Sequence, residues 1–251
     1  MKNSSVFLLI AFLSTLQFCN VLPKRKFYSN YFTPGYRCSN DTEWDNKEKH
    51  KLYRKLWENL KLEYSQKNRE IGSVPNVIAG NSLVHLLQDD ILKREFSEFN
   101  IAARGISGDE TTTFLERFDE NVLSLGPKVL VIEIGGNDLI RGRCFPMIQN
   151  NVRKIISRAK DFNPKIKIVF LAVPPTGSPD LNSVVPVYNA FLQNLVKETE
   201  GAVYADTWKD MFDYNTLSIR QEYVRENKDP LHFNEKGYEV WAKVLRPHLS
   251  K

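Results

Sequence analysis

The stretch Val77–Leu83, which reads VIAGNSL, places a serine at a corner between a strand and a helix. The apolar run Val77–Ala79 predicts a buried strand, and large apolar residues then recur at helical spacing from Leu83 to Ile91. Ser82 therefore stands at the N-terminus of a helix, where free backbone N–H groups favour a developing negative charge. Because serines at such corners also act as ordinary helix caps, this stretch alone does not establish catalysis.

A second short stretch, near the C-terminus, supplies the partners that a nucleophilic serine needs. Residues 229–232, which read DPLH, place a carboxylate three residues before a histidine in a turn that contains proline. This spacing lets Asp229 hold one ring nitrogen of His232 while the other nitrogen faces a hydroxyl. We therefore predict that Ser82, His232 and Asp229 form a catalytic triad.

Length and charge limit the kind of protein that carries this triad. The chain has 251 residues, 42% of them hydrophobic, which is enough for one sizeable α/β core. The net charge is +5, but the excess of Lys and Arg lies in residues 19–72, whereas acidic and basic residues nearly balance in residues 73–251. Without a basic, aromatic stripe in the main domain, nucleic acid is not predicted as a partner. The basic N-terminal segment better suits an anionic membrane surface.

Beyond Pro75, short apolar strands alternate with helical patterns, as in a parallel sheet covered by helices on both faces. The expected strands are Val77–Ala79, Phe99–Ala103, Val129–Ile134, Ile166–Val173 and Ala202–Ala205. The expected helices are Leu83–Phe96, Thr111–Leu125, Pro146–Phe162, Pro186–Glu200 and Lys236–Leu249. This pattern predicts an α/β fold with a five-stranded parallel sheet in the flavodoxin-like order. Ligands bind such sheets at the carboxyl ends of the strands.

Two glycine-containing loops follow predicted strands at that edge. Residues 104–109, RGISGD, follow the second strand, and their glycines permit a close approach of backbone N–H groups to a ligand. Residues 135–138, GGND, follow the third strand and present a side-chain amide. Each loop alone is also compatible with an ordinary turn, but their occurrence in order at successive strand ends indicates a site.

These four stretches together resemble the sequence blocks of the SGNH or GDSL hydrolases, in particular the lysophospholipase/thioesterase and platelet-activating-factor acetylhydrolase-like members. The resemblance implies a three-layer α/β/α sandwich and hydrolysis of carboxylic esters through an acyl-enzyme on Ser82. It further implies an oxyanion hole formed by the N–H groups of Ser82 and Gly108 and the side chain of Asn137. Asp229 and His232 complete the triad, and the resemblance implies no metal and no organic cofactor.

The chain departs from the family pattern at two places. Asn81 stands where the family usually has aspartate, and Ala102 and Ala103 stand where many relatives carry an asparagine. Two other functions therefore stay open beside ester hydrolysis. One is a surface lipoprotein that uses the fold as a non-catalytic binding module, and the other is an acyltransferase acting on an envelope polysaccharide.

The N-terminus predicts export. Residues 1–18 have the charged start and short apolar run of a signal peptide, and the sequence LQFC at residues 16–19 resembles a bacterial lipoprotein signal. We expect lipidation of Cys19, which anchors the protein in the cell envelope; the alternative is ordinary cleavage and a periplasmic or secreted protein. Residues 19–72 are expected to form a basic tether and a helical extension, and residues 73–251 the hydrolase domain.

Lipidation of Cys19 leaves Cys38 and Cys144 as an even pair in an oxidising compartment, where a disulfide persists. The sequence does not establish that these two residues pair. Neither lies in a CxxC motif or beside clustered histidines, so metal binding and thiol catalysis are not predicted.

Overall fold

The computed structural model describes residues 27–40, 48–226 and 229–251, so the predicted signal peptide and Cys19 lie outside the described residues. The sheet has five parallel strands in the order β2-β1-β3-β4-β5. These strands are β1 (Asn76–Gly80), β2 (Ile101–Gly105), β3 (Val129–Glu133), β4 (Lys167–Leu171) and β5 (Ala202–Ala205). The predicted flavodoxin-like order is therefore confirmed.

The central strands are buried on both of their faces. Every residue of β1 and β3 is buried, whereas the edge strand β5 is mostly half-buried. Parallel strands covered by helices on both sides need apolar residues at successive positions, which explains the continuous apolar runs in the sequence.

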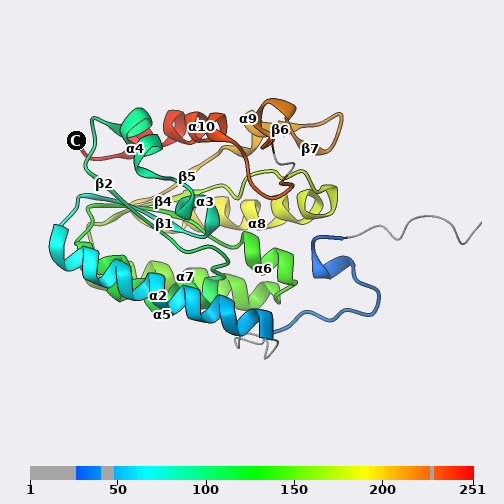
Figure 1. Ribbon diagram of the computed structural model, residues 1–251, viewed down its shortest axis with the longest axis horizontal. Coiled ribbons are helices and arrows are strands. Elements are labelled where there is room, and N and C mark those ends of the chain that lie inside the picture. Colours follow the sequence, from blue (N-terminus) through cyan, green and yellow to red (C-terminus); the bar gives the residue numbers. More distant parts are fainter. Residues whose placement is uncertain (1–26, 41–47, 227–228) are drawn as a thin grey trace, which may run out of the picture.

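Two layers of helices cover the sheet (Figure 1). One face packs against α5 (Thr111–Asn121), α7 (Phe145–Phe162) and α8 (Pro179–Lys197). The other packs against α3 (Ser82–His85), α4 (Asp89–Phe96) and α10 (Glu235–Leu245). The two faces have separate apolar cores, one centred on Phe114, Phe118 and Tyr188 and the other on Phe96 and Trp241. This is the expected three-layer α/β/α sandwich.

The 24-residue helix α2 (Glu48–Ile71) lies outside these layers and runs along α5 (Figure 1). It corresponds to the predicted helical extension. The remaining short elements are η2 (Asn30–Phe32), η3 (Leu123–Leu125), α6 (Gly136–Arg141), α9 (Trp208–Met211), β6 (Phe212–Asp213), β7 (Ser218–Ile219), η4 (Gln221–Tyr223) and η5 (Arg246–His248). Within the described ranges, no helix combines the length and apolar character needed to cross a membrane.

Several predicted boundaries were wrong. The helix expected at 83–96 is two helices, because the chain leaves helical geometry after His85 and restarts at Asp89. The helix expected from Pro186 begins at Pro179, where proline suits the first turn and Ser178 precedes it; Pro186 lies inside that helix. The second strand begins at Ile101 rather than Phe99 and extends to Gly105.

Candidate active site

Ser82 begins α3 at the carboxyl end of β1. Asn81 caps this helix, and its side-chain oxygen accepts a hydrogen bond of 2.9 Å from the backbone N–H of Leu83. Gly80 precedes the corner, and a Cβ atom there would lie 2.0 Å from the carbonyl oxygen of Glu133. Only glycine therefore fits between β1 and β3 at this point, which explains Gly80, two positions before the serine.

The structure brings the three predicted triad residues together. The Ser82 hydroxyl lies 2.7 Å from Nε2 of His232, and Nδ1 of His232 lies 2.7 Å from a carboxylate oxygen of Asp229. The other Asp229 oxygen accepts hydrogen bonds from the backbone N–H groups of Leu231 and His232, at 2.9 Å and 3.3 Å. This arrangement fixes the imidazole orientation and lets Nε2 take a proton from Ser82.

Asp229 stays ionised at neutral pH. Burial raises the pKa of its carboxyl, but hydrogen bonds from the Leu231 N–H and the His232 ring, together with the charge of the imidazolium, lower the pKa below its ordinary value overall. An ionised carboxylate here can stabilise positive charge on the His232 ring.

The predicted oxyanion donors line the same cleft, which has a volume of about 660 Å³. Gly108 adopts a φ of +83°, a conformation that favours glycine. Asn137 lies in the first turn of α6, and its side-chain amide donates a hydrogen bond of 2.9 Å to the carbonyl oxygen of Asp109. Since an amide group carries two hydrogens, the second remains to donate to a substrate.

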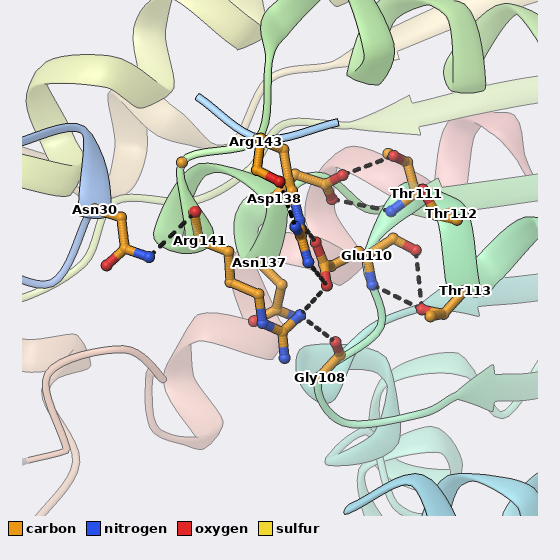
Figure 2. Close-up of polar contacts among 12 residues, drawn as sticks. Asn30, Gly108, Glu110, Thr111, Thr112, Thr113, Asn137, Asp138, Arg141 and Arg143 are labelled. Atoms are coloured by element: carbon orange, nitrogen blue, oxygen red, sulfur yellow. Dashed lines mark hydrogen bonds and ion pairs between the residues drawn. The ribbon is translucent and has the colours of Figure 1, made fainter. Parts of the chain in front are cut away.

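Sequence reasoning assigned no role to the two aspartates that follow the oxyanion residues. Asp109 is fully buried, forms an ion pair of 2.6 Å with Arg117, and accepts hydrogen bonds from Trp57 and Thr113. Burial raises the pKa of Asp109, and the Arg117 charge opposes this. Asp138 accepts hydrogen bonds from the N–H and the hydroxyl of Thr111 (Figure 2), and burial raises its pKa to about 7.

A cluster of two arginines and one glutamate borders the cleft beside Gly108 (Figure 2). Arg141 donates to the carbonyl oxygen of Gly108 at 3.1 Å and pairs with Glu110, while Arg143 pairs with the same glutamate. Sequence reasoning did not connect these residues, because Glu110 precedes α5 whereas the arginines lie at and after the end of α6.

Glu133 is a buried acid at the end of β3, next to the serine corner. Burial raises the pKa of its carboxyl to about 8, and the Asn81 side-chain amide lowers the pKa only in part. No hydrogen bond of normal geometry reaches either carboxyl oxygen within the described part of the chain. Glu133 is therefore neutral at pH 7, and the Asn81 amide meets a neutral carboxyl. An acid inside an otherwise apolar strand was the available signal in the sequence.

A second serine–histidine pair lies near the first. Ser107, which lines the cleft, has its hydroxyl 2.9 Å from Nδ1 of His85, and burial lowers the pKa of His85. No hydrogen bond links the His85 ring to a carboxylate among the described residues. This pair therefore lacks the third member of a triad.

Comparison with known proteins places these features in a family. The model of the GDSL-like Lipase/Acylhydrolase family matches residues 78–240. The chain is 28% identical over 96 residues to Esterase TesA of Pseudomonas aeruginosa, a match that covers 38% of this chain and 47% of that protein. It is 32% identical over 89 residues to an Arylesterase of Vibrio mimicus, a match that covers 36% and 44%. The chain thus spans about half the length of these curated relatives.

Solved structures show the same fold. A GDSL-like lipase from Bacteroides thetaiotaomicron superposes with a TM-score of 0.66 and 21% identity, covering 74% of this chain and 95% of the other. A variant of an acetyl xylan esterase from Geobacillus stearothermophilus superposes with a TM-score of 0.55 and 15% identity, covering 70% and 94%.

Proposed function

Since the chain belongs to the GDSL-like lipase/acylhydrolase family, we propose that it hydrolyses carboxylic esters through an acyl-enzyme on Ser82. The observation that carries the proposal is the continuous relay from the Ser82 hydroxyl through His232 to Asp229, with both distances at 2.7 Å. A binding module has no need for this relay, so catalysis is favoured over the non-catalytic alternative.

In the proposed mechanism, Nε2 of His232 takes the Ser82 proton as the hydroxyl oxygen attacks the ester carbonyl. The negative charge that develops on the carbonyl oxygen is met by the N–H groups of Ser82 and Gly108 and by the Asn137 amide. The imidazolium then protonates the leaving alcohol. A water molecule, deprotonated by the same histidine, attacks the acyl-enzyme carbonyl. The bond to the Ser82 oxygen then breaks, the histidine returns the proton to that oxygen, and the acid is released.

The cleft supports an ester with an apolar part. One wall is apolar and is formed by α6, the loop after β4 and α8, through Ile140, Val173, Pro174, Leu181 and Val185. The cleft has a volume of about 660 Å³, well above the volume of an acetyl group. The acyl chain of a lipid or lysophospholipid ester can pack against this apolar wall, whereas an acetylated glycan offers only a methyl group. A panel of p-nitrophenyl esters from acetate to octanoate, compared with acetylated xylan, tests this choice: a preference for the acetylated glycan would contradict it.

Labelling with a fluorophosphonate tests the nucleophile. We expect wild-type protein to be labelled, with the adduct on the peptide that contains Ser82, and Ser82→Ala to lose both the label and esterase activity while remaining folded. Ser107→Ala is the matched control, because it removes the hydroxyl of the other serine–histidine pair and should still be labelled. Labelling of folded Ser82→Ala, or loss of labelling in Ser107→Ala alone, would refute the assignment.

Acyl transfer to a sugar uses the same acyl-enzyme and differs only in the acceptor. Incubation with an activated ester and an oligosaccharide separates the two activities by their products. We expect free acid as the product; an acylated oligosaccharide formed in preference to free acid would replace hydrolysis with transfer.

We further propose that the protein is exported and anchored in the cell envelope through a lipid on Cys19. The basic residues 24–26 lie shortly after this cysteine, and an acyl anchor beside positive charge gives the two signals that stable membrane attachment requires. The disulfide between Cys38 and Cys144 supports an oxidising compartment. We expect the mature protein to enter the detergent phase and Cys19→Ser to release it; an unmodified N-terminus elsewhere in a water-soluble wild-type protein would contradict the anchor.

A further inference from the structure

Two segments that precede the family-matched region 78–240 reach the oxyanion loop, Gly105–Asp109, one by direct contact and the other through Arg141. One is α2, which runs along α5 (Figure 1). The other is residues 27–40, here called the N-terminal strap, which packs on α6. Neither segment contributes a strand to the five-stranded sheet. Their connections to this loop, direct for α2 and through Arg141 for the strap, therefore require a separate explanation.

Helix α2 contacts the oxyanion loop at three of the loop's residues, Gly105, Gly108 and Asp109. The Tyr64 hydroxyl donates a hydrogen bond of 2.7 Å to the carbonyl oxygen of Gly105. The ring of Tyr53 packs on Gly108, where a Cβ atom would lie 2.4 Å from a ring carbon. The indole N–H of Trp57, a residue only 2% exposed, donates a hydrogen bond of 2.6 Å to Asp109.

Asp109 links α2 to two of the three predicted oxyanion donors, Gly108 and Asn137. Its side chain is held by Trp57 of α2 together with Arg117 and Thr113 of α5, and its backbone carbonyl oxygen accepts the hydrogen bond from the Asn137 amide. Its chain neighbour is Gly108, which supplies the backbone donor. A shift of Asp109 therefore moves the Gly108 N–H and the Asn137 amide at once.

The strap supports the other side of the same loop. Arg141 donates to the carbonyl oxygen of Gly108, and Glu110 holds both Arg141 and Arg143 (Figure 2). The strap in turn binds the backbone of both arginines. The bonds are Tyr36 hydroxyl to Arg141 O at 2.6 Å, Asn30 amide to Arg141 O at 3.2 Å, and Tyr31 hydroxyl to Arg143 O, with the Cys38–Cys144 disulfide beside them.

We infer that α2 and the strap form a clamp that positions the oxyanion donors, with Trp57 as its main positioning residue. This inference rests on the proposed ester hydrolysis. Because the donors bind the carbonyl oxygen most strongly as charge develops on it, loosening the clamp lowers kcat and leaves KM nearly unchanged. Trp57 and Tyr64 of α2 then act on catalysis only by positioning the oxyanion loop.

Two variants of α2 in the full chain test the inference. Trp57→Phe keeps an aromatic ring but removes the N–H that holds Asp109, and we expect kcat to fall about tenfold with KM within about twofold. Ser65→Ala is the matched control on the same helix. It removes a hydrogen bond of 2.6 Å from Ser65 to Glu120 of α5, and Ser65 lies twelve positions after Tyr53, the α2 residue that packs on Gly108. We expect this variant to melt at a lower temperature with kcat unchanged.

The outcomes separate the clamp from the proposed function. A folded Trp57→Phe variant with wild-type kcat, or an equal loss of kcat in both variants, would overturn the clamp while leaving ester hydrolysis in place. Wild-type protein that neither hydrolyses esters nor reacts with a fluorophosphonate would overturn both. If Trp57→Phe does not fold, Tyr64→Phe removes the hydrogen bond to Gly105 instead, and it must show the same selective loss of kcat.

Discussion

Replacing Glu133 with glutamine should change how the stability of the protein depends on pH. The pKa of Glu133 is raised by burial from 4.5 to about 8, so the folded protein keeps a proton that the unfolded chain releases above pH 4.5. A carboxyl with a raised pKa makes the free energy of unfolding fall as pH rises between these two values. The contribution of the protonated Glu133 carboxyl to the free energy of unfolding is fully present below pH 4.5 and is lost as pH approaches 8.

The size of the effect follows from the pKa difference. Each pKa unit corresponds to about 1.4 kcal/mol, so ionisation of this one group lowers the stability of wild-type protein by up to about 5 kcal/mol across this range. Glutamine is nearly isosteric, is always neutral and still meets the Asn81 amide. We therefore expect Glu133→Gln to gain stability over wild type progressively from pH 5 to pH 8, and the difference to level off above pH 8.

Urea denaturation of both proteins at half-unit steps from pH 5 to 9 measures this difference. Asp138, whose pKa is raised to about 7, adds its own pH dependence to both proteins and cancels in the comparison. Glu98→Gln is the control, since the Glu98 side chain is 49% exposed. Parallel stability curves for wild type and Glu133→Gln would refute the assignment of a neutral buried carboxyl.

Three further predictions concern the site and its support. Asn137→Ala should lower kcat by about 100-fold or more with a smaller effect on KM, because its hydrogen bond strengthens as charge develops; an effect confined to KM in steady-state kinetics would make Asn137 a ground-state binding residue. Asn81→Asp should be tolerated at pH 7, because neutral Glu133 can donate to the new carboxylate. Its kcat should fall relative to wild type only above about pH 8, the wild-type pKa of Glu133, because the added negative charge raises this pKa further; a flat ratio in the pH profile would argue against this pairing. Replacing Cys38 and Cys144 together with serine should lower the free energy of unfolding by about 2 to 5 kcal/mol, since the disulfide closes a loop of 106 residues; unchanged denaturant midpoints would mean that it constrains little.

The sheet and the triad were predictable because their signals are local. Buried parallel strands need continuous apolar runs, and β1 and β3 carry such runs over residues 77–79 and 129–132. The triad and oxyanion residues occupy short blocks of fixed spacing that follow strands, so their order along the chain already indicates one edge of the sheet. The break between α3 and α4 was missed because leucines continue at helical spacing through it.

The support of the site was not predictable, because it depends on contacts between residues far apart in the sequence. Trp57 and Asp109 are separated by 52 positions, and Tyr36 and Arg141 by 105, with no periodic pattern to connect them. The sequence of α2 indicates only an amphipathic helix, and such a helix is expected simply to pack its apolar side on the main domain. Glu133 is the exception, since a single acid in a buried apolar strand is visible in the sequence and is costly unless it is neutral or paired. An isolated charged residue in a buried strand therefore marks a position where the folded protein must pair or neutralise the charge, even when the sequence does not identify the partner.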